Sequence, residues 1–335
     1  MLCSQHGANS AAFYGQMDVL KWLAEPPPDS DRQPVLCSEH GADRAAGEGH
    51  LDVLQWLAEP PLESGRAPVL CSEHGTDNAA SYGRTDVLKW LAEPPPGSDR
   101  KPVLCSQRVV DDAARFGHMK ALKWLASPPV GSGRAPMLCS ESGADSAAYF
   151  GQMDVLKWLA EPSAGSGRAP VLCSQRGADY AAGEGHLDVL QWLASPPAGS
   201  GRAPVLCSEH GADNAASYGR TDVLTWLAEP PLGSDRQPVL WRCSEYSPDD
   251  AARDGHLEVL KWLASPPADS GREPVLCSQR GADNAAGRGH LELLKWLASP
   301  PADSGCEPVL CSKHGADEAA RWGHSDVVDW LASRQ

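Results

Sequence analysis

Residues 38–58 of the chain read Ser-Glu-His-Gly-Ala-Asp-Arg-Ala-Ala-Gly-Glu-Gly-His-Leu-Asp-Val-Leu-Gln-Trp-Leu-Ala, and variants of this stretch recur along the whole sequence. The tryptophan marks the register. Eight of the nine intervals between successive marker tryptophans are 34 residues, and one is 36. The markers are Trp22, Trp56, Trp90, Trp124, Trp158, Trp192, Trp226, Trp262, Trp296 and Trp330. A strict period of this size is typical of a solenoid, in which small stacked units contact only their neighbours.

Each unit is predicted to hold two short helices. Ser38 followed by good helix formers is typical of a helix N-cap, and the first helix should run to about Glu48. Gly49 ends this helix, as a glycine after a C-terminus often does. The second helix begins near His50 and is apolar on most sides, which indicates neighbours on both flanks and places Trp56 in the core. The Pro-rich stretch that follows predicts turn and extended chain.

Residues 45–57, from the Ala-Ala pair through the Gly-His turn to the second helix, resemble the ankyrin-repeat consensus, and the resemblance covers all ten units. We therefore expect an all-α, ankyrin-like α-solenoid of ten 34-residue helix-turn-helix repeats with Pro-rich linkers. The unit has His40-Gly41-Ala42-Asp43 where the family has Thr-Pro-Leu-His, and its linker lacks the family's Gly-Ala-Asp-x-Asn. These departures leave open whether the linkers form ankyrin-type hairpins. Tetratricopeptide repeats share the period but not this pattern.

A larger copy lies within the repetition. Residues 47–56 recur unchanged at 183–192, and 81–85 recur at 217–221, each 136 residues later. We predict one ankyrin-like repeat domain over residues 1–335, in which 1–136 and 137–274 are a duplicated four-unit block and 275–335 are two further units. The copy either presents one surface twice to a bivalent partner or reflects recent gene expansion alone. Because the first unit begins within a linker, a fragment of a longer array is an open alternative.

Charge and hydropathy exclude several classes of partner. The chain has 29 basic and 44 acidic residues, a net charge of −15, which argues against nucleic acid and against anionic membranes. It contains no run of about 18 apolar residues, and its start lacks a basic stretch followed by an apolar one. These features predict a cytoplasmic protein, with the nucleus as an alternative.

The reactive side chains repeat too regularly to indicate catalysis. Ten of the eleven cysteines occur once per unit, where small buried thiols would fill the seam between units, and Cys306 stands where other linkers carry arginine. Five units read Cys-x-x-His, but zinc needs four ligands and no second pair lies nearby. One aspartate in each of the last nine units forms an acidic ladder rather than a carboxylate pair. The ankyrin resemblance implies that the Gly-His histidines are structural hydrogen-bonders. We predict no enzyme, no metal and no cofactor.

Sequence variety concentrates in the two residues between Ala-Ala and Gly, where all three phenylalanines and four of the six tyrosines lie. Aromatic and arginine side chains dominate interface hot spots. In ankyrins the first helices line the concave surface, and the resemblance implies the same here. The predicted partner-binding residues are Tyr14, Tyr82, Phe116, Phe150, Tyr218, Arg253, Arg288 and Trp322. The alternative is that these large side chains cover the neighbouring unit, although a core position rarely accepts glutamate, arginine and tyrosine in turn.

The predicted function is therefore that of a scaffold that binds a protein partner through its first helices. An acidic surface favours a partner with basic segments. Two alternatives come from other classes. One is a structural spacer, or a recently expanded array without a dedicated ligand. The other is a thiol- or zinc-dependent sensor, for which Cys306 is the one locally unusual residue.

Overall fold

The computed structural model describes residues 4–27, 31–61, 64–95, 100–128, 134–163, 166–197, 200–229, 246–266, 273–301 and 304–334. Within these residues the chain forms twenty helices and no strand. The chain divides into two compact units, Met1–Ala147 with Asp154–Leu172, and Ala148–Met153 with Cys173–Gln335. Cys3, Cys243 and the Trp241-Arg242 insertion lie outside the described residues.

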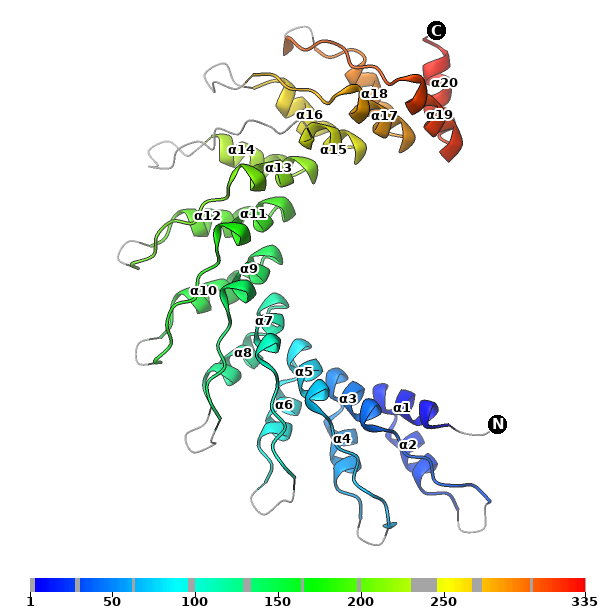
Figure 1. Ribbon diagram of the computed structural model, residues 1–335, viewed down its shortest axis with the longest axis vertical. Helices are drawn as coiled ribbons and strands as arrows, with labels where there is room; N and C mark the ends of the chain where they lie inside the picture. The colour runs from blue at the N-terminus through cyan, green and yellow to red at the C-terminus, as the bar shows by residue number, and fades with distance from the viewer. Residues whose placement is uncertain are drawn as a thin grey trace. The chain divides into compact units, whose positions relative to one another are not determined.

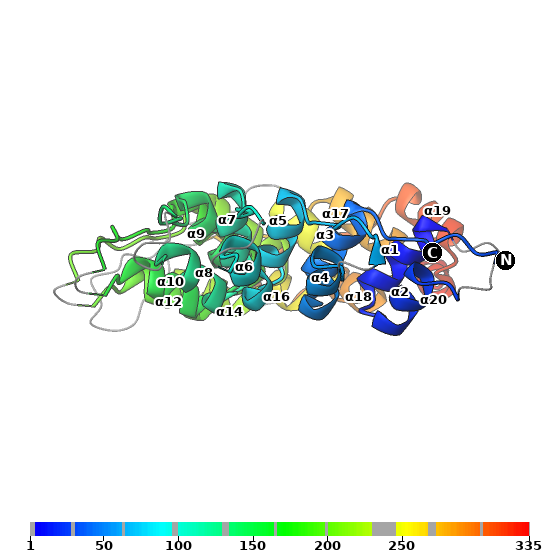
Figure 2. The same cartoon turned by 90° about the horizontal axis from the view of Figure 1, so that it is seen from below.

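The helices alternate between first and second members of a pair. Within each of the two compact units, the first helices of successive repeats form one row and the second helices form another (Figure 1). The two rows form two layers in the turned view (Figure 2). The first helices are α1 (Gln5–Phe13), α3 (Glu39–Glu48), α5 (Glu73–Ser81), α7 (Gln107–Arg115), α9 (Glu141–Tyr149), α11 (Gln175–Glu184), α13 (Glu209–Ser217), α15 (Ser247–Arg253), α17 (Gln279–Gly287) and α19 (Lys313–Trp322). The second helices are α2 (Met17–Ala24), α4 (Leu51–Ala58), α6 (Thr85–Ala92), α8 (Met119–Ala126), α10 (Met153–Ala160), α12 (Leu187–Ala194), α14 (Thr221–Ala228), α16 (Leu257–Ala264), α18 (Leu291–Leu297) and α20 (Ser325–Ala332). The predicted all-α solenoid of paired helices is confirmed.

In the core of each repeat, small residues of the first helix pack against large residues of the second. Ala45 and Ala46 of α3 are fully buried, and Leu54 and Leu57 of α4 are almost so. Six of the repeated cysteines are buried as predicted: Cys37, Cys71, Cys139, Cys173, Cys207 and Cys277. Gly49 ends α3 in the left-handed region, with φ of +87°, which confirms its predicted role.

A carboxylate on one first helix fastens the N-cap serine of the next repeat. Asp43 in α3 accepts hydrogen bonds from the backbone N–H of Ser72 (2.8 Å) and from its hydroxyl (2.7 Å), and Ser72 is the N-cap of α5. The same two bonds form Asp77–Ser106, Asp111–Ser140, Asp179–Ser208, Asp249–Ser278 and Asp283–Ser312. We call these pairs the Asp–Ser staples. The acidic ladder of the sequence is thus a set of contacts between repeats.

Most first helices carry a glycine near their start, beside the staple, although α7 has Val109 at this position and still forms the Asp77–Ser106 staple. A Cβ on Gly75 would lie 2.6 Å from Oδ1 of Asp43, closer than Cβ atoms approach other groups in proteins, and 3.0 Å from Cβ of Cys71, which is a tight contact. Glycine in a helix interior costs about 1 kcal/mol relative to alanine. Here two hydrogen bonds between repeats form beside it and offset that cost.

In six repeats the linker places an arginine over the marker tryptophan. In the fifth linker, the guanidinium carbon of Arg168 lies 3.9 Å from the ring centroid of Trp158, and its Nη2 donates to the Trp158 carbonyl at 3.0 Å. We call this contact the Arg–Trp clamp. It recurs at Arg32–Trp22, Arg66–Trp56, Arg100–Trp90, Arg134–Trp124 and Arg202–Trp192. The tryptophans therefore lie half-buried under arginine at the edge of the core, not inside it as the sequence suggested, and Trp22 is 54% exposed.

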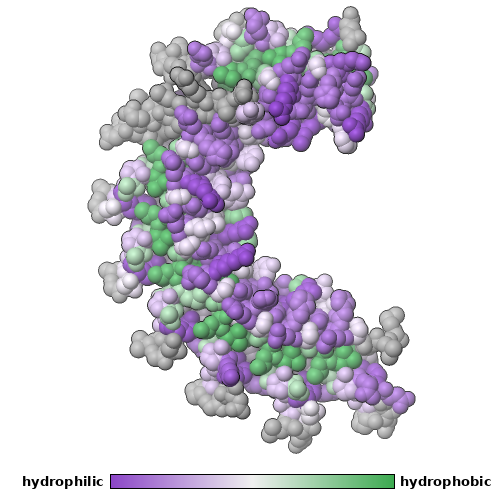
Figure 3. Space-filling view, viewed as in Figure 1, coloured by the Kyte–Doolittle hydropathy of each residue, from purple (hydrophilic) through white to green (hydrophobic). Residues whose placement is uncertain are grey.

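The linker then rejoins the helix pair through the backbone. The N–H of Val35 donates to the carbonyl of Leu23 at 2.9 Å, and the equivalent bond recurs in later repeats. Hydrophobic colour gathers along the side of each unit where the linkers return, whereas the row of first helices is largely hydrophilic (Figure 3). The described helices include none that combines the length and the apolar composition needed to cross a bilayer.

The Asp–Ser staples predict a graded response to substitution. Asp43→Ala leaves the N-cap N–H of Ser72 without its partner and should lower the free energy of unfolding by about 1–3 kcal/mol. Asp43→Asn should cost much less, because the Oδ1 of Asn9 already accepts from both the backbone N–H and the hydroxyl of Ser38. Urea unfolding followed by circular dichroism measures both. The exposed Asp52→Ala is the control, and an equal loss in Asp52→Ala and Asp43→Ala would contradict the role of the staple.

The Arg–Trp clamp predicts a stabilising substitution. Cys306 lies ten residues after Trp296, the position that arginine occupies in the other linkers. Cys306→Arg should raise the free energy of unfolding by about 0.5–1 kcal/mol, the usual contribution of a cation–π contact at an exposed site. Arg168→Ala should lower it, because the clamp on Trp158 is lost. Thermal unfolding checks both, and no change in either variant would show that the clamp contributes nothing.

Candidate functional site

All eight predicted contact residues lie where a first helix ends. Tyr14, Tyr82, Phe116, Tyr218 and Arg288 are the C-caps of α1, α5, α7, α13 and α17; Phe150 directly follows α9; and Arg253 and Trp322 end α15 and α19. The next glycine often has positive φ, as Gly83 does at +68°, so the chain reverses there. The aromatic side chains at these ends are exposed, from 36% for Phe150 to 66% for Tyr14.

The rings of Tyr82 and Tyr218 also pack against the preceding repeat. A Cβ on Gly47 would lie 3.5 Å from Cδ2 of Tyr82, an ordinary van der Waals distance, so the ring packs beside α3. Tyr82 nevertheless remains 57% exposed. The same side chain therefore packs against its neighbour and is exposed. Coverage of the neighbouring repeat and contact with a partner, the two roles considered from the sequence, are compatible.

Arginines and neighbouring rings hold these aromatic side chains in place. The guanidinium carbon of Arg44 lies 4.0 Å from the centroid of the Phe13 ring, and Phe13 and Tyr14 pack edge to face at 4.8 Å. Tyr149 and Phe150 form the same kind of pair, also at 4.8 Å. Such contacts restrict the rotamers of side chains that would otherwise move freely at the surface.

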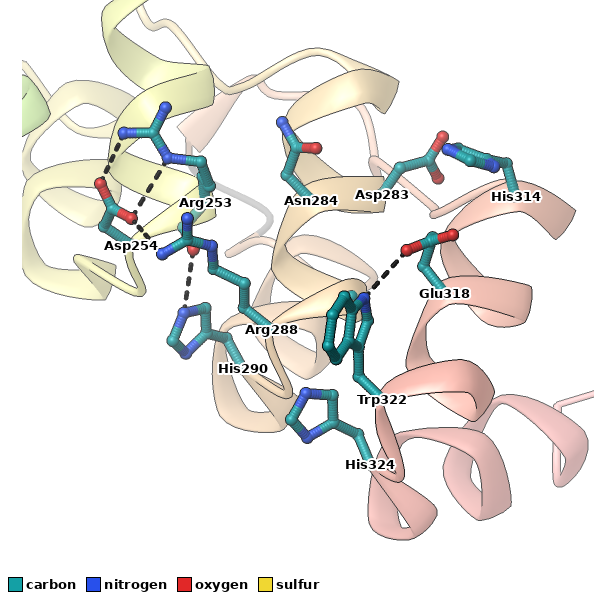
Figure 4. Close-up of a pocket in the computed structure, with 11 residues that line it drawn as sticks. Arg253, Asp254, Asp283, Asn284, Arg288, His290, His314, Glu318, Trp322 and His324 are labelled. Carbon is teal, nitrogen blue, oxygen red and sulfur yellow. Dashed lines mark hydrogen bonds and ion pairs between the residues drawn. The ribbon is translucent and has the colours of Figure 1, made fainter.

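The last three first helices, α15, α17 and α19, surround an open groove of about 940 Å³. Figure 4 shows side chains from all three helices facing it. Gly287 lies in the middle helix, at a position that is also glycine in α3 and α11 and is larger in the other repeats. The groove is lined by Arg253, Asp254, Asp283, Asn284, Gly287, Arg288, His290, His314, Glu318, Trp322 and His324. The structure thus brings Arg253, Arg288 and Trp322 together, while the other five predicted residues lie on separate repeats.

One wall of the groove is a network of ion pairs. Arg253 contacts Asp254 and Asp250, each at 2.7 Å, and Arg288 reaches Asp254 at 3.0 Å. The hydrogen bond from Arg253 holds the pKa of Asp254 below its usual range, and the same bond raises the pKa of Arg253. Asp254 therefore fixes both guanidinium groups at the surface (Figure 4).

The opposite wall presents an indole. The Nε1 of Trp322 donates to Glu318 at 3.0 Å, and Arg321 pairs with the other oxygen of that carboxylate at 3.3 Å. The hydrogen bond from Trp322, followed by that from Arg321, lowers the pKa of Glu318. Trp322 is still 65% exposed, so one face of a fixed indole, with a carboxylate beside it, is open to solvent.

Sequence reasoning missed Asp250, Asn284 and Glu318, which share one position directly after the ladder residue. A signal was present, because this position varies as freely as the pair before glycine. It reads Ser10, Arg44, Asn78, Asp112, Ser146, Tyr180, Asn214, Asp250, Asn284 and Glu318 along the ten units.

The histidines of the Gly-His turns contact backbone. The ring Nε2 of His50 lies 3.0 Å from the carbonyl oxygen of Phe13 in the preceding repeat, and His290 has the same relation to Arg253. Where arginine replaces histidine, its Nε makes the bond instead, as Arg84 does to the Gly47 carbonyl at 2.9 Å. The structural role expected for these histidines is confirmed.

The repeated thiols are poorly suited to reaction. Burial raises the pKa of Cys37 to about 11 and those of Cys71 and Cys277 to about 12. A thiol is nucleophilic and binds metal as the thiolate, which these values disfavour at neutral pH. Over the part of the chain that the structure describes, no three His, Cys, Asp or Glu side chains form a group suited to a metal ion.

No protein-family model matches the chain, and no curated protein matches its sequence.

The ion-pair network predicts a pH-dependent effect of one substitution. Because the folded-state pKa of Asp254 is lowered, its stabilisation is complete above the usual aspartate pKa of about 3.9 and is lost as the pH falls through the lower folded value. Asp254→Asn should therefore lower the free energy of unfolding by about 1 kcal/mol at neutral pH, a value suited to a partly exposed network. Urea unfolding across the pH range measures this.

The control for this measurement is Asp188→Asn on the exposed face of α12. At acid pH, below the folded-state pKa, Asp254→Asn and the native chain should be equally stable. A difference between them that persists unchanged into acid would show that the carboxylate charge is not the cause.

Proposed function

We propose that the chain is an ankyrin-like recognition module that binds a protein partner through the surface of its first helices. The observation that carries this proposal is the row of exposed aromatic side chains on a largely hydrophilic helix face. Tyr14, Tyr82, Tyr218 and Trp322 are all more than half exposed, at 66%, 57%, 51% and 65%. Aromatic and arginine side chains supply most of the binding energy at protein interfaces.

The contacts that hold these side chains support the proposal. Phe13, Tyr14, Tyr149 and Phe150 lie in ring pairs, and Trp322 is hydrogen-bonded to Glu318. A surface ordered before binding loses less conformational entropy when a partner arrives. The helix pairs beneath it are joined by Asp–Ser staples, so the scaffold is itself built of fixed contacts.

The ankyrin-like identity rests on three features. The units are helix pairs of 34 residues, their Gly-His turns contact the preceding repeat through the histidine ring, and residues 45–57 resemble the consensus. The described linker residues contain no strand, which differs from the hairpins of that family. We assign the chain to the cytoplasm or nucleus as part of the same proposal, because its described cysteines are free thiols.

The partner that fits best carries basic segments. The net charge is −15, Glu318 lies beside the exposed ring of Trp322, and Glu48 and Glu184 are partly exposed at the ends of their first helices. A lysine or arginine of the partner can stack on a ring and pair with such a carboxylate. Charge complementarity of this kind also accelerates association.

A structural spacer is the second candidate. Its support is the contact of Tyr82 with Gly47, which gives the ring a packing role without any partner. The two candidates differ in what they predict for binding, since a spacer retains its interactions when the exposed rings are removed.

The test compares two variants of the full chain in a lysate pull-down read by mass spectrometry. The first variant carries serine in place of Tyr82, Phe116, Phe150 and Tyr218. The second, which is the control, carries serine in place of Lys89, Lys123, Lys157 and Asp222, which are exposed on the second helices. We expect the first variant to lose a partner that the native chain and the second variant retain, with unchanged circular dichroism. Identical catches from all three proteins, or none, would favour the spacer.

A further inference from the structure

One part of the first-helix surface occurs twice with the same structure. It comprises Gly47, Glu48, Tyr82 and Arg84 in repeats two and three, and Gly183, Glu184, Tyr218 and Arg220 in repeats six and seven. We call these two sets the tyrosine patches. The first lies within one compact unit and the second within the other.

The contacts inside the two tyrosine patches agree closely. Arg84 Nε donates to the Gly47 carbonyl at 2.9 Å, and Arg220 Nε donates to the Gly183 carbonyl at 3.0 Å. The ion pair Arg84–Glu48 measures 3.6 Å and Arg220–Glu184 measures 3.7 Å.

The tyrosine rings are placed alike as well. Tyr82 and Tyr218 cover the glycines of the preceding repeats at nearly equal distances, 3.5 and 3.4 Å from the position of an added Cβ. They are 57% and 51% exposed. Sequence identity and local geometry therefore coincide at both patches.

Two surfaces with the same residues in the same arrangement must have nearly the same intrinsic affinity for a given ligand. This holds whether the copy was selected or arose by gene expansion alone, because affinity depends on the atoms present. The surroundings differ in places, since Arg44 and Phe116 near the first patch correspond to Tyr180 and Asp254 near the second. A ligand that contacts mainly the patch will not distinguish them.

We propose that the two tyrosine patches are equivalent binding sites for one basic peptide segment, so that each chain takes two copies of it. This rests on the proposed function and adds to it a ligand chemistry and a stoichiometry. Each patch offers an exposed tyrosine ring and a partly exposed carboxylate, Glu48 or Glu184, whose ion pair with the arginine of the same patch is longer than a hydrogen bond, at 3.6 and 3.7 Å. A lysine or arginine side chain stacks on such a ring and pairs with such a carboxylate. The net charge of −15 favours the same ligand.

The stoichiometry has a consequence for affinity. A partner that carries the basic segment twice can occupy both patches, and its second contact then forms within the complex. Linked contacts of this kind raise the overall affinity by about 10²–10⁴-fold when the linker can span the two sites. A partner with one segment gains nothing from the second patch except a second bound copy.

The first experiment places a photo-crosslinking amino acid, p-benzoylphenylalanine, in the full chain at Tyr82 or at Tyr218. The matched controls carry it at Asp86 or Asp222, which are exposed in the same two repeats but on the second helices. After irradiation in lysate, mass spectrometry identifies the attached peptide. We expect one and the same peptide, containing lysine or arginine, at both tyrosine positions and at neither control. Different peptides at the two tyrosine positions, or a peptide at only one, would overturn the proposal.

The second experiment titrates a synthetic peptide of the crosslinked sequence into the chain by calorimetry. We expect two sites per native chain, one in Tyr82→Ser or Tyr218→Ser, and none in the double variant, each shown to be folded by circular dichroism. A single site in the native chain contradicts the proposal.

The crosslinker at Tyr14, Phe116 and Trp322 separates this proposal from the proposed function. Partner peptides at those positions, with none at Tyr82 and Tyr218, would refute the tyrosine patches and leave protein recognition by the first helices intact. The absence of any peptide at all five positions would refute both.

Discussion

The structure depends on the bond between an aspartate carboxylate and the N-cap serine of the next repeat. Asp43 accepts from both the backbone N–H and the hydroxyl of Ser72, so one side chain caps a helix that lies 29 residues further along the chain. Gly75 lies against this contact, since a Cβ there would lie 2.6 Å from the carboxylate, whereas α7 carries Val109 at the same position and still accepts the Asp77–Ser106 staple. The contact also sets the register in which first helices stack, and hence which side chains of successive repeats become neighbours on the first-helix surface. The exposed rings, the ion pairs and the groove all inherit their spacing from it.

The features that the sequence predicted are those with local signals. The period, the helix pairs, the serine caps and the terminating Gly49 depend on residues close together in the chain, and all were found. The function of the acidic ladder was not predictable in this way, because the partner of Asp43 lies in another repeat. The Arg–Trp clamp was missed for a related reason. A linker rich in proline and glycine predicts turns but not the face on which its arginine lands, so the tryptophans were assigned to the interior.

The candidate site shows the same division. The exposure of Tyr82 and Trp322 followed from their position before a helix-ending glycine, whereas the network around Asp254 depends on Arg288 from the next repeat. The side chains of this surface have two roles at once. The ring of Tyr82 packs beside Gly47 of the preceding repeat, and more than half of the surface of Tyr82 is still exposed to solvent. A surface built in this way can change its recognition properties through residues that the helix stack tolerates in many forms, while the stapled residues beneath stay constant.

The uniformity of the Asp–Ser staples has a genetic consequence. Every junction between stapled repeats uses the same donor and acceptor atoms. Recombination between two misaligned repeats that preserves the reading frame therefore places an aspartate beside a serine from another repeat, and the two can form the same hydrogen bonds. The chain can then be lengthened or shortened by whole repeats without an intermediate that fails to fold. The recurrence of residues 47–56 at 183–192 is what one such event would leave behind. A lineage carrying this array can therefore revise how many copies of a surface it displays faster than point mutation can redesign one.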